Sequence, residues 1–181
     1  NLSVGEPKNL PPEEVLEILN LKSKTLSQYP TTKGTLEIRQ SYCNWLFSRF
    51  GLVNPLDPNE NVLPLSGTLE GIFSFVQSVV DTSKENPLVV MPNPCYKIYE
   101  GAAHLAGASS FFVSSRPEDG FKPDFDSVPD NIWTDCQLLI LCSPSNPTGY
   151  CMSSEEYLKV LHLAEKFNFI VCSDECYVDI Y

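Results

Sequence analysis

Short apolar runs alternate with helix-like segments along most of this chain, and this alternation limits the possible folds more than any other feature. The candidate strands are residues 62–65, 88–91, 110–113, 137–142 and 168–172. Helix-like segments at 68–80, 96–106 and 153–167 separate several of them. Apolar strands joined by helices are typical of a mostly parallel sheet that is covered on both faces. We therefore predict an α/β fold with three layers, α/β/α.

The part of the chain before residue 62 has a different pattern, with two predicted helices. The first covers residues 11–28, because prolines followed by Glu13 and Glu14 suit the first turn of a helix. The second covers residues 35–50, and Gly51 suits its end. We expect this part to precede the strand-rich part as a helical arm.

The composition excludes several classes of function. With 43% hydrophobic and 19% charged residues among 181, the chain can bury a core. A net charge of -11 argues against nucleic acid or an anionic membrane surface as a partner, and no apolar stretch reaches the ~18 residues that span a bilayer. The 7 cysteines form no C-x-x-C pair and no zinc-like spacing with histidine, so we expect no metal site and reduced thiols in the cytoplasm.

The candidate site consists of the residues that follow the predicted strands, because open α/β sheets bind ligands beyond the carboxyl ends of their strands. After the first run, Gly67 and Thr68 open a helix whose free N–H groups suit a phosphate, although an ordinary N-cap has the same pattern. Tyr96 follows the second run, where its ring either stacks on a planar ligand or joins the core. Asn146 stands between two prolines after the fourth run and offers an amide held in one direction.

The last run leads directly into Asp174. A carboxylate that continues a buried strand needs a partner, which an arginine, a helix N-terminus or the protonated ring nitrogen of a ligand would provide. Tyr177 is close enough in sequence to reach the same ligand. A phosphate cradle, a stacking ring, an amide, a buried acid and a phenol along one sheet edge together suit pyridoxal 5′-phosphate. A nucleotide has no need of the carboxylate, and the glycine pattern is not G-x-G-x-x-G.

Several motifs, in family order, resemble those of the fold-type I, class I and II aminotransferases. They are Leu2–Pro7, Tyr29-Pro30 with Gly34, Gly67–Gly71, Pro94-Cys95-Tyr96, Asn146–Gly149 and Asp174–Tyr177. The resemblance implies an N-terminal arm or small-domain segment over residues 1–30, and the first part of a cofactor-binding large domain over residues 31–181. It also implies pyridoxal phosphate as the cofactor, and an amino acid and a keto acid as substrates.

The resemblance assigns roles to the residues at the strand ends. Thr68, together with the N–H groups of Thr68 and Leu69, would hold the cofactor phosphate. Tyr96 would stack on the pyridine ring. Asn146 and Tyr177 would form hydrogen bonds to the 3′-oxygen of the ring.

Three further roles follow from the resemblance. Asp174 would pair with the ring nitrogen and keep it protonated, which makes the ring an electron sink. Tyr29 would reach the cofactor phosphate of the neighbouring subunit in a homodimer, and Gly5 would lie in the loop that meets the substrate carboxylate. The family's catalytic lysine and the arginine that binds the substrate are both expected after Tyr177. We therefore expect these residues to be an N-terminal portion that is inactive alone.

Within the family, some stretches resemble the succinyldiaminopimelate transaminases of bacterial diaminopimelate and lysine biosynthesis. They are Trp45–Leu52, Asn93–Ala102, Phe125–Trp133 and Cys142–Gly149. Leu69 and Ser145 depart from that pattern, since a basic residue and a glycine are expected there. This resemblance implies transfer of an amino group from glutamate to N-succinyl-2-amino-6-oxopimelate. Alternatives are another class I/II aminotransferase, a pyridoxal-phosphate-dependent β-lyase, and the aminotransferase-like domain of a transcription regulator.

Overall fold

The computed structural model describes residues 9–180 and divides the chain into two compact units, Asn1–Pro64 and Leu65–Tyr181. The division falls where the helical part of the sequence meets the strand-rich part. The sequence predicts a different boundary, between an N-terminal arm over residues 1–30 and the large domain over residues 31–181. That boundary stays a prediction. Within residues 9–180, no helix is both long enough and apolar enough to cross a membrane.

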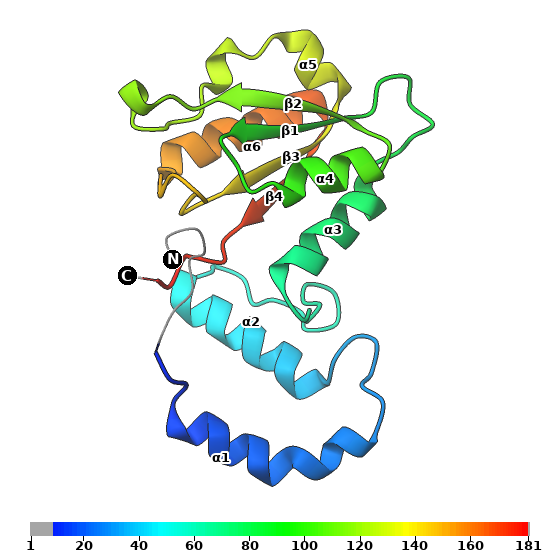
Figure 1. The fold of residues 1–181 in the computed structure, drawn as a ribbon, viewed down its shortest axis with the longest axis vertical. Helices are drawn as coiled ribbons and strands as arrows, with labels where there is room; N and C mark the ends of the chain where they lie inside the picture. Colours follow the sequence, from blue (N-terminus) through cyan, green and yellow to red (C-terminus); the bar gives the residue numbers. More distant parts are fainter. Residues whose placement is uncertain (1–8, 181) are drawn as a thin grey trace. The chain divides into compact units, whose positions relative to one another are not determined.

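The first unit contains the two helices that the sequence predicts (Figure 1). Helix α1 covers Glu13–Lys22 and continues into a 3-10 helix over Ser23–Ser27. Helix α2 covers Leu36–Phe50. Thr35 accepts a hydrogen bond from the backbone N–H of Ile38 at the start of α2, and Gly51 ends the helix in the left-handed region at φ 59°.

The second unit is built on a four-stranded sheet with the order β2-β1-β3-β4 (Figure 1). The strands are β1 (Leu88–Asn93), β2 (Ser109–Ser114), β3 (Cys136–Cys142) and β4 (Ile170–Asp174). All three neighbouring pairs are parallel, and the last paired residues of β3 and β4 are Cys142 and Asp174. The predicted parallel sheet is confirmed, and its carboxyl ends lie along one edge.

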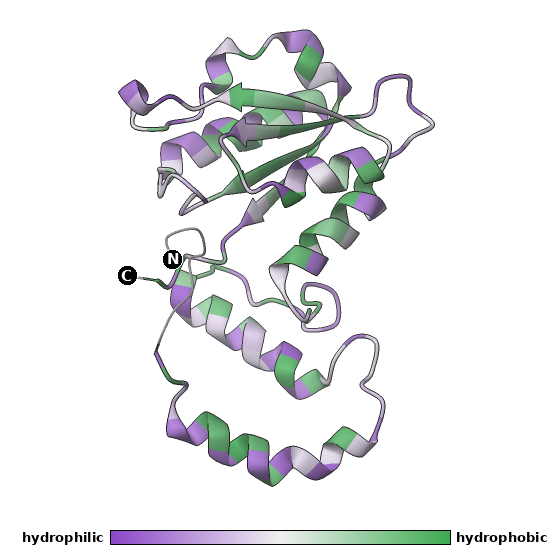
Figure 2. Ribbon diagram, viewed as in Figure 1, coloured by the Kyte–Doolittle hydropathy of each residue, from purple (hydrophilic) through white to green (hydrophobic). Residues whose placement is uncertain are grey.

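Helices cover both faces of this sheet, which confirms the predicted three layers. They are α3 (Thr68–Val79), α4 (Ile98–Leu105), α5 (Asp130–Asp135) and α6 (Ser154–Phe167). On one face, Ile72 of α3 and Tyr99 of α4 pack with Ile140 of β3. On the other face, Trp133 of α5 and Val160 of α6 pack with the neighbouring strand residues. In Figure 2 β3 is mostly green, the colour of hydrophobic residues, whereas α6 carries both colours.

The structure corrects three details of the prediction. The strand expected at residues 62–65 is wrong, because Pro64 has no N–H for a ladder and Leu63 and Leu65 are 60% and 57% exposed. Helix α5 was not predicted, since it is too short to show a clear period. Strand β4 starts and ends two residues later than predicted, because Asn168 ends α6 in the left-handed region at φ 60°. Asp174 is therefore the last residue of the strand.

Replacing Leu139 by alanine is expected to reduce the free energy of unfolding of the complete protein by about 2–5 kcal/mol. Leu139 is fully buried in β3, and truncation of its side chain leaves a cavity in the core cluster that packs on this inner strand of the sheet. Leu158→Ala is the matched control, since this leucine of α6 is 56% exposed, and its effect should stay below about 0.5 kcal/mol. Urea unfolding of both variants measures the difference, and equal effects would contradict the buried position of Leu139.

Candidate functional site

The parallel register brings the ends of β3 and β4 together at one edge of the sheet. The backbone N–H of Ser143, the first residue after β3, donates to the backbone oxygen of Asp174 at 3.2 Å. The segment after β1, which carries Tyr96, leads into helix α4 on one face of the same sheet. The side chains that follow these strands therefore share one edge, as the sequence predicts.

Asp174 is the buried acid of this edge, with only 6% of its surface exposed. Its Oδ2 atom accepts a hydrogen bond from the phenol of Tyr99 at 2.8 Å, and its Oδ1 atom accepts one from the backbone N–H of Cys176 at 3.3 Å. Within residues 9–180, no lysine, arginine or histidine forms an ion pair with this carboxylate. The described residues thus supply hydrogen bonds to Asp174 but no positive charge.

Tyr99 is the partner of Asp174 and comes from the first turn of α4, where it is 1% exposed. Burial and the hydrogen bond to Asp174 raise the pKa of Tyr99, so its phenol stays protonated and acts as the donor. Its ring packs edge-on against the ring of Tyr96, with centroids 5.9 Å apart and planes at 89°. Tyr96 itself is partly buried against the core, beside the site.

Asn146 lies in the loop that follows β3, and several backbone contacts hold this loop in place. The Ser145 N–H donates to the Tyr150 oxygen at 2.9 Å, and the Gly149 N–H donates to the Ser145 oxygen at 2.7 Å. The thiol of Cys142 donates to the Pro144 oxygen at 3.2 Å, and the backbone N–H of Asn146 faces the same sulfur. The loop therefore places Asn146 next to the end of β3.

Tyr177 completes the group beyond β4. Its side chain is 37% exposed. Partial burial is the largest cause that raises the pKa of Tyr177, and the charges of Cys176, Cys142 and Asp174 act in the same direction. Three residues predicted for the site, Asn146, Asp174 and Tyr177, thus surround the paired ends of β3 and β4.

Three thiols also lie within electrostatic reach of Asp174. Burial is the first cause that raises the pKa of Cys142, with the charge of Asp174 acting in the same direction. Burial and Asp174 raise the pKa of Cys172 to about 11 and that of Cys176 to about 12. The groups around the carboxylate are therefore neutral at pH 7.

The first turn of α3 is the predicted phosphate cradle. Gly67 is its N-cap, and among residues 9–180 no side-chain cap accepts a hydrogen bond from the N–H groups at this end of the helix, which include those of Thr68 and Leu69. The far end of α3 is fixed at the start of β3, because Asp81 and Gln137 exchange two hydrogen bonds of 2.6 and 3.0 Å. The N-terminus of α3, the positive end of its dipole, therefore points toward the carboxyl edge of the sheet.

Two predicted site residues do not belong to the described residues of the second unit. Tyr29 belongs to the first unit, where its side chain is fully exposed. Gly5 lies outside the described residues. Both roles stay predictions.

The sequence reasoning missed Tyr99 as a partner of Asp174. The expected partners were an arginine, a helix N-terminus or a ligand ring nitrogen, whereas the structure supplies a neutral phenol from a residue 75 positions away. A signal was present, since Tyr99 follows Tyr96 by three residues and this spacing places both rings on one side of a helical turn.

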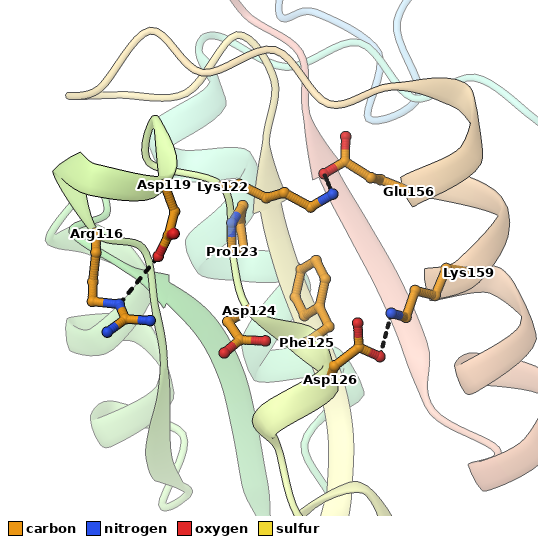
Figure 3. A pocket seen from close by; sticks show the side chains of 9 residues that line it. All are labelled: Arg116, Asp119, Lys122, Pro123, Asp124, Phe125, Asp126, Glu156 and Lys159. Atoms are coloured by element: carbon orange, nitrogen blue, oxygen red, sulfur yellow. Dashed lines mark ion pairs between the residues drawn. The ribbon is translucent and has the colours of Figure 1, made fainter.

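A separate cavity of about 300 Å³ lies outside this group of residues (Figure 3). It is lined by Arg116, Asp119, Lys122, Pro123, Asp124, Phe125, Asp126, Glu156 and Lys159. Figure 3 shows three ion pairs in its lining, and these join Arg116 to Asp119 at 3.2 Å, Lys122 to Glu156 at 3.2 Å, and Lys159 to Asp126. None of the predicted site residues lines it.

The comparisons with known proteins identify the family. The model of the family "Aminotransferase class I and II" matches residues 1–181. The chain belongs to the class I and II aminotransferases. This aminotransferase chain is 32% identical over 182 residues to the LL-diaminopimelate aminotransferase of Syntrophobacter fumaroxidans, an alignment that covers 99% of the chain and 46% of that relative.

Solved structures agree with this assignment. An aminotransferase from Neisseria meningitidis has a TM-score of 0.93 at 38% identity, covering 99% of the chain and 45% of that structure. A probable N-succinyldiaminopimelate aminotransferase from Thermus thermophilus has a TM-score of 0.81 at 29% identity, and the match covers 95% of the chain and 45% of that structure. The aminotransferase chain thus spans about half the length of the relatives it matches. The predicted fold-type I architecture and pyridoxal phosphate, the cofactor of this family, are both confirmed.

The pH dependence of stability tests the polar groups at the start of α6. Partial burial alone would raise the pKa of Glu156, but hydrogen bonds from Tyr150 and Ser153 together with Lys122 lower it to about 2. A lowered pKa in the folded state means that this stabilisation is present above pH 4.5 and is lost as the pH falls toward about 2.

The variant Glu156→Gln should therefore lose less stability than the wild type between those pH values. Thermal melts at a series of pH values measure the change. Glu155→Gln, at an exposed position in the same turn, should behave like the wild type. Parallel curves for the wild type and Glu156→Gln would contradict the lowered pKa.

Proposed function

We propose that the complete protein is a pyridoxal-phosphate-dependent aminotransferase that moves an amino group between an amino acid, with glutamate as the donor, and a keto acid. The observation that carries this proposal is the carboxylate of Asp174, which is buried at the carboxyl edge without a cation among the described residues. A buried charge needs an opposite charge, and a protonated ring nitrogen supplies one. The family assignment supports the same cofactor.

The residues of the edge suit the other parts of this cofactor. The uncapped N–H groups of Thr68 and Leu69 would bind its phosphate. Tyr96 would pack against its ring, and the amide of Asn146 and the phenol of Tyr177 would donate to its ring oxygen. When bound, pyridoxal phosphate supplies an electron sink for the substrate α-carbon. The part of Asp174 in the reaction is to hold a proton at the ring nitrogen.

We place the remaining functional groups in other parts of the complete protein. Because the chain covers 46% of the Syntrophobacter relative, the lysine that carries the cofactor and moves the substrate proton would lie in the part without a counterpart here. Tyr29 would contribute to the site of a second subunit in a cytoplasmic homodimer, and Gly5 would meet the substrate carboxylate. We expect the 181 residues alone to be inactive.

Two substrates of similar carbon skeleton compete within this proposal. The motifs around Tyr96 and Asn146 support N-succinyl-2-amino-6-oxopimelate, and so does the Thermus thermophilus structure. The relatives at about 30% identity support LL-diaminopimelate instead. Both would place the protein in diaminopimelate and lysine biosynthesis.

An assay of the complete protein separates these alternatives. With glutamate as donor and the N-succinyl keto acid as acceptor, 2-oxoglutarate and the corresponding N-succinyl amino acid should form if the first substrate is right. With LL-diaminopimelate as donor and 2-oxoglutarate as acceptor, glutamate should form if the second is right. Release of pyruvate and ammonia from a β-substituted amino acid, without transfer, would indicate a β-lyase. Cofactor binding without turnover of any of these substrates would indicate a regulator.

Replacing Asp174 by asparagine is expected to weaken the binding of pyridoxal phosphate at least about tenfold, because the charge opposite the ring nitrogen is lost. A titration of the complete apoprotein with pyridoxal phosphate, followed by absorbance, measures the dissociation constant. Asp126→Asn is the control, since this exposed acid pairs with Lys159 outside the site. Unchanged affinity in Asp174→Asn would contradict the proposed pairing.

A further inference from the structure

We propose that Tyr99 is a positioning residue, whose phenol aims and stabilises the carboxylate of Asp174 toward the cationic group that Asp174 binds. The identity of that group as the cofactor ring nitrogen rests on the proposed function. The hydrogen bond itself is observed between two side chains of this chain and does not depend on that identity. It joins the first turn of α4 to the last residue of β4.

The geometry of this contact is that of a strong hydrogen bond. The distance of 2.8 Å from the Tyr99 oxygen to Asp174 Oδ2 lies within the usual range for an O–H donor. Both residues are buried, at 1% and 6% exposure, so water does not compete for either group. A hydrogen bond to an ionised acceptor is about twice as strong as one between neutral groups.

The ring of Tyr99 is fixed by its surroundings. It packs in the core cluster with Ile72, Ala102 and Ala103. The rings of Tyr99 and Tyr96 form a T-shaped pair, with an angle of 89° between their planes. A side chain held in this way has few other rotamers, so the phenol oxygen stays opposite Asp174. The same contacts link the orientation of the carboxylate to Tyr96, the predicted stacking ring.

Asp174 keeps free acceptor capacity for a ligand. Oδ2 accepts a hydrogen bond from Tyr99 and Oδ1 accepts one from the N–H of Cys176, and the thiol of Cys176 is a further hydrogen-bond partner of the carboxylate. A carboxylate offers about four lone-pair positions, so Asp174 can accept a further donor beside these partners. Only a donor can occupy these positions while the acid is ionised, and a ring N–H is such a donor.

The other titratable groups around Asp174 do not provide a competing charge. They are the thiols of Cys142 on β3, Cys172 on β4 and Cys176 beyond it, and the phenol of Tyr177. Burial and the charge of Asp174 raise the pKa of Cys172 and Cys176 to about 11 and about 12, so these thiols are neutral at pH 7. Among the described residues, Tyr99 is the buried side chain that donates a hydrogen bond to this carboxylate.

The expected consequence concerns one proton, shared between the ring nitrogen and Asp174. A hydrogen-bond donor to the carboxylate stabilises its ionised form. It therefore favours the state in which the ring nitrogen is protonated and Asp174 is ionised over the state in which the ring nitrogen is neutral and Asp174 carries the proton. In Tyr99→Phe this stabilisation is lost, while the ring volume stays the same. The proton should then leave the ring nitrogen at a pH lower by about 1, and pyridoxal phosphate should bind roughly tenfold more weakly.

The test uses the complete protein, reconstituted with pyridoxal phosphate that carries ¹⁵N in the ring. The ¹⁵N chemical shift, followed over pH, reports the protonation of the ring nitrogen without any turnover. Tyr157→Phe is the matched control, because it removes a phenol that lies 3.3 Å from the Ser173 hydroxyl, next to Asp174 in sequence. Site-specific 3-fluorotyrosine at position 99 is the second variant, since it keeps the ring and makes the phenol a stronger donor.

The inference predicts that Tyr99→Phe lowers the pH of ring deprotonation, that 3-fluorotyrosine raises it, and that Tyr157→Phe leaves it unchanged. If Tyr99→Phe does not fold, the 3-fluorotyrosine protein decides on its own. A ring nitrogen that titrates alike in the wild type and both Tyr99 variants would overturn the inference and leave Tyr99 as a core residue. Failure of the wild-type protein to bind pyridoxal phosphate would instead overturn the proposed function.

Discussion

Parallel pairing of all the strands with their neighbours is the constraint on which the rest of the second unit depends. Strand β3 lies between β1 and β4, and its residues Leu138–Leu141 are fully buried. Such a strand is stable only if both faces of the sheet are covered, which the pairs α3/α4 and α5/α6 achieve. The same pairing sends every strand end to one edge, so a loop there can bring together residues from distant parts of the chain.

The sequence alone predicts the parts of this structure that have a local signal. The four strands of the sheet, the α-helices of eight or more residues and the acid at the end of β4 all follow from apolar runs and the residues beside them. The run at 62–65 has the same local signal but forms no strand, because Pro64 removes a donor and no strand of the described residues pairs with it. Local pattern therefore identifies candidates, whereas strand pairing decides which are used.

The contacts within the site are beyond local pattern for a different reason. Tyr99 and Asp174 are 75 residues apart, and their hydrogen bond depends on how α4 packs over the sheet. The need of Asp174 for a partner was predictable, since a buried charge is costly. The identity of that partner was not, because a phenol, an arginine and a helix N-terminus meet the same requirement.

Burial, and then the charge of the acid at the end of β4, also decide how the neighbouring thiols react. Thiolates, not thiols, are the strong nucleophiles, and the pKa values of Cys172 and Cys176, raised to about 11 and about 12, keep both side chains in the thiol form at pH 7. An electrophile that enters this edge, such as an aldehyde, therefore meets sulfur atoms of low reactivity. A cysteine-rich edge can in this way hold a reactive carbonyl compound without trapping it as a sulfur adduct.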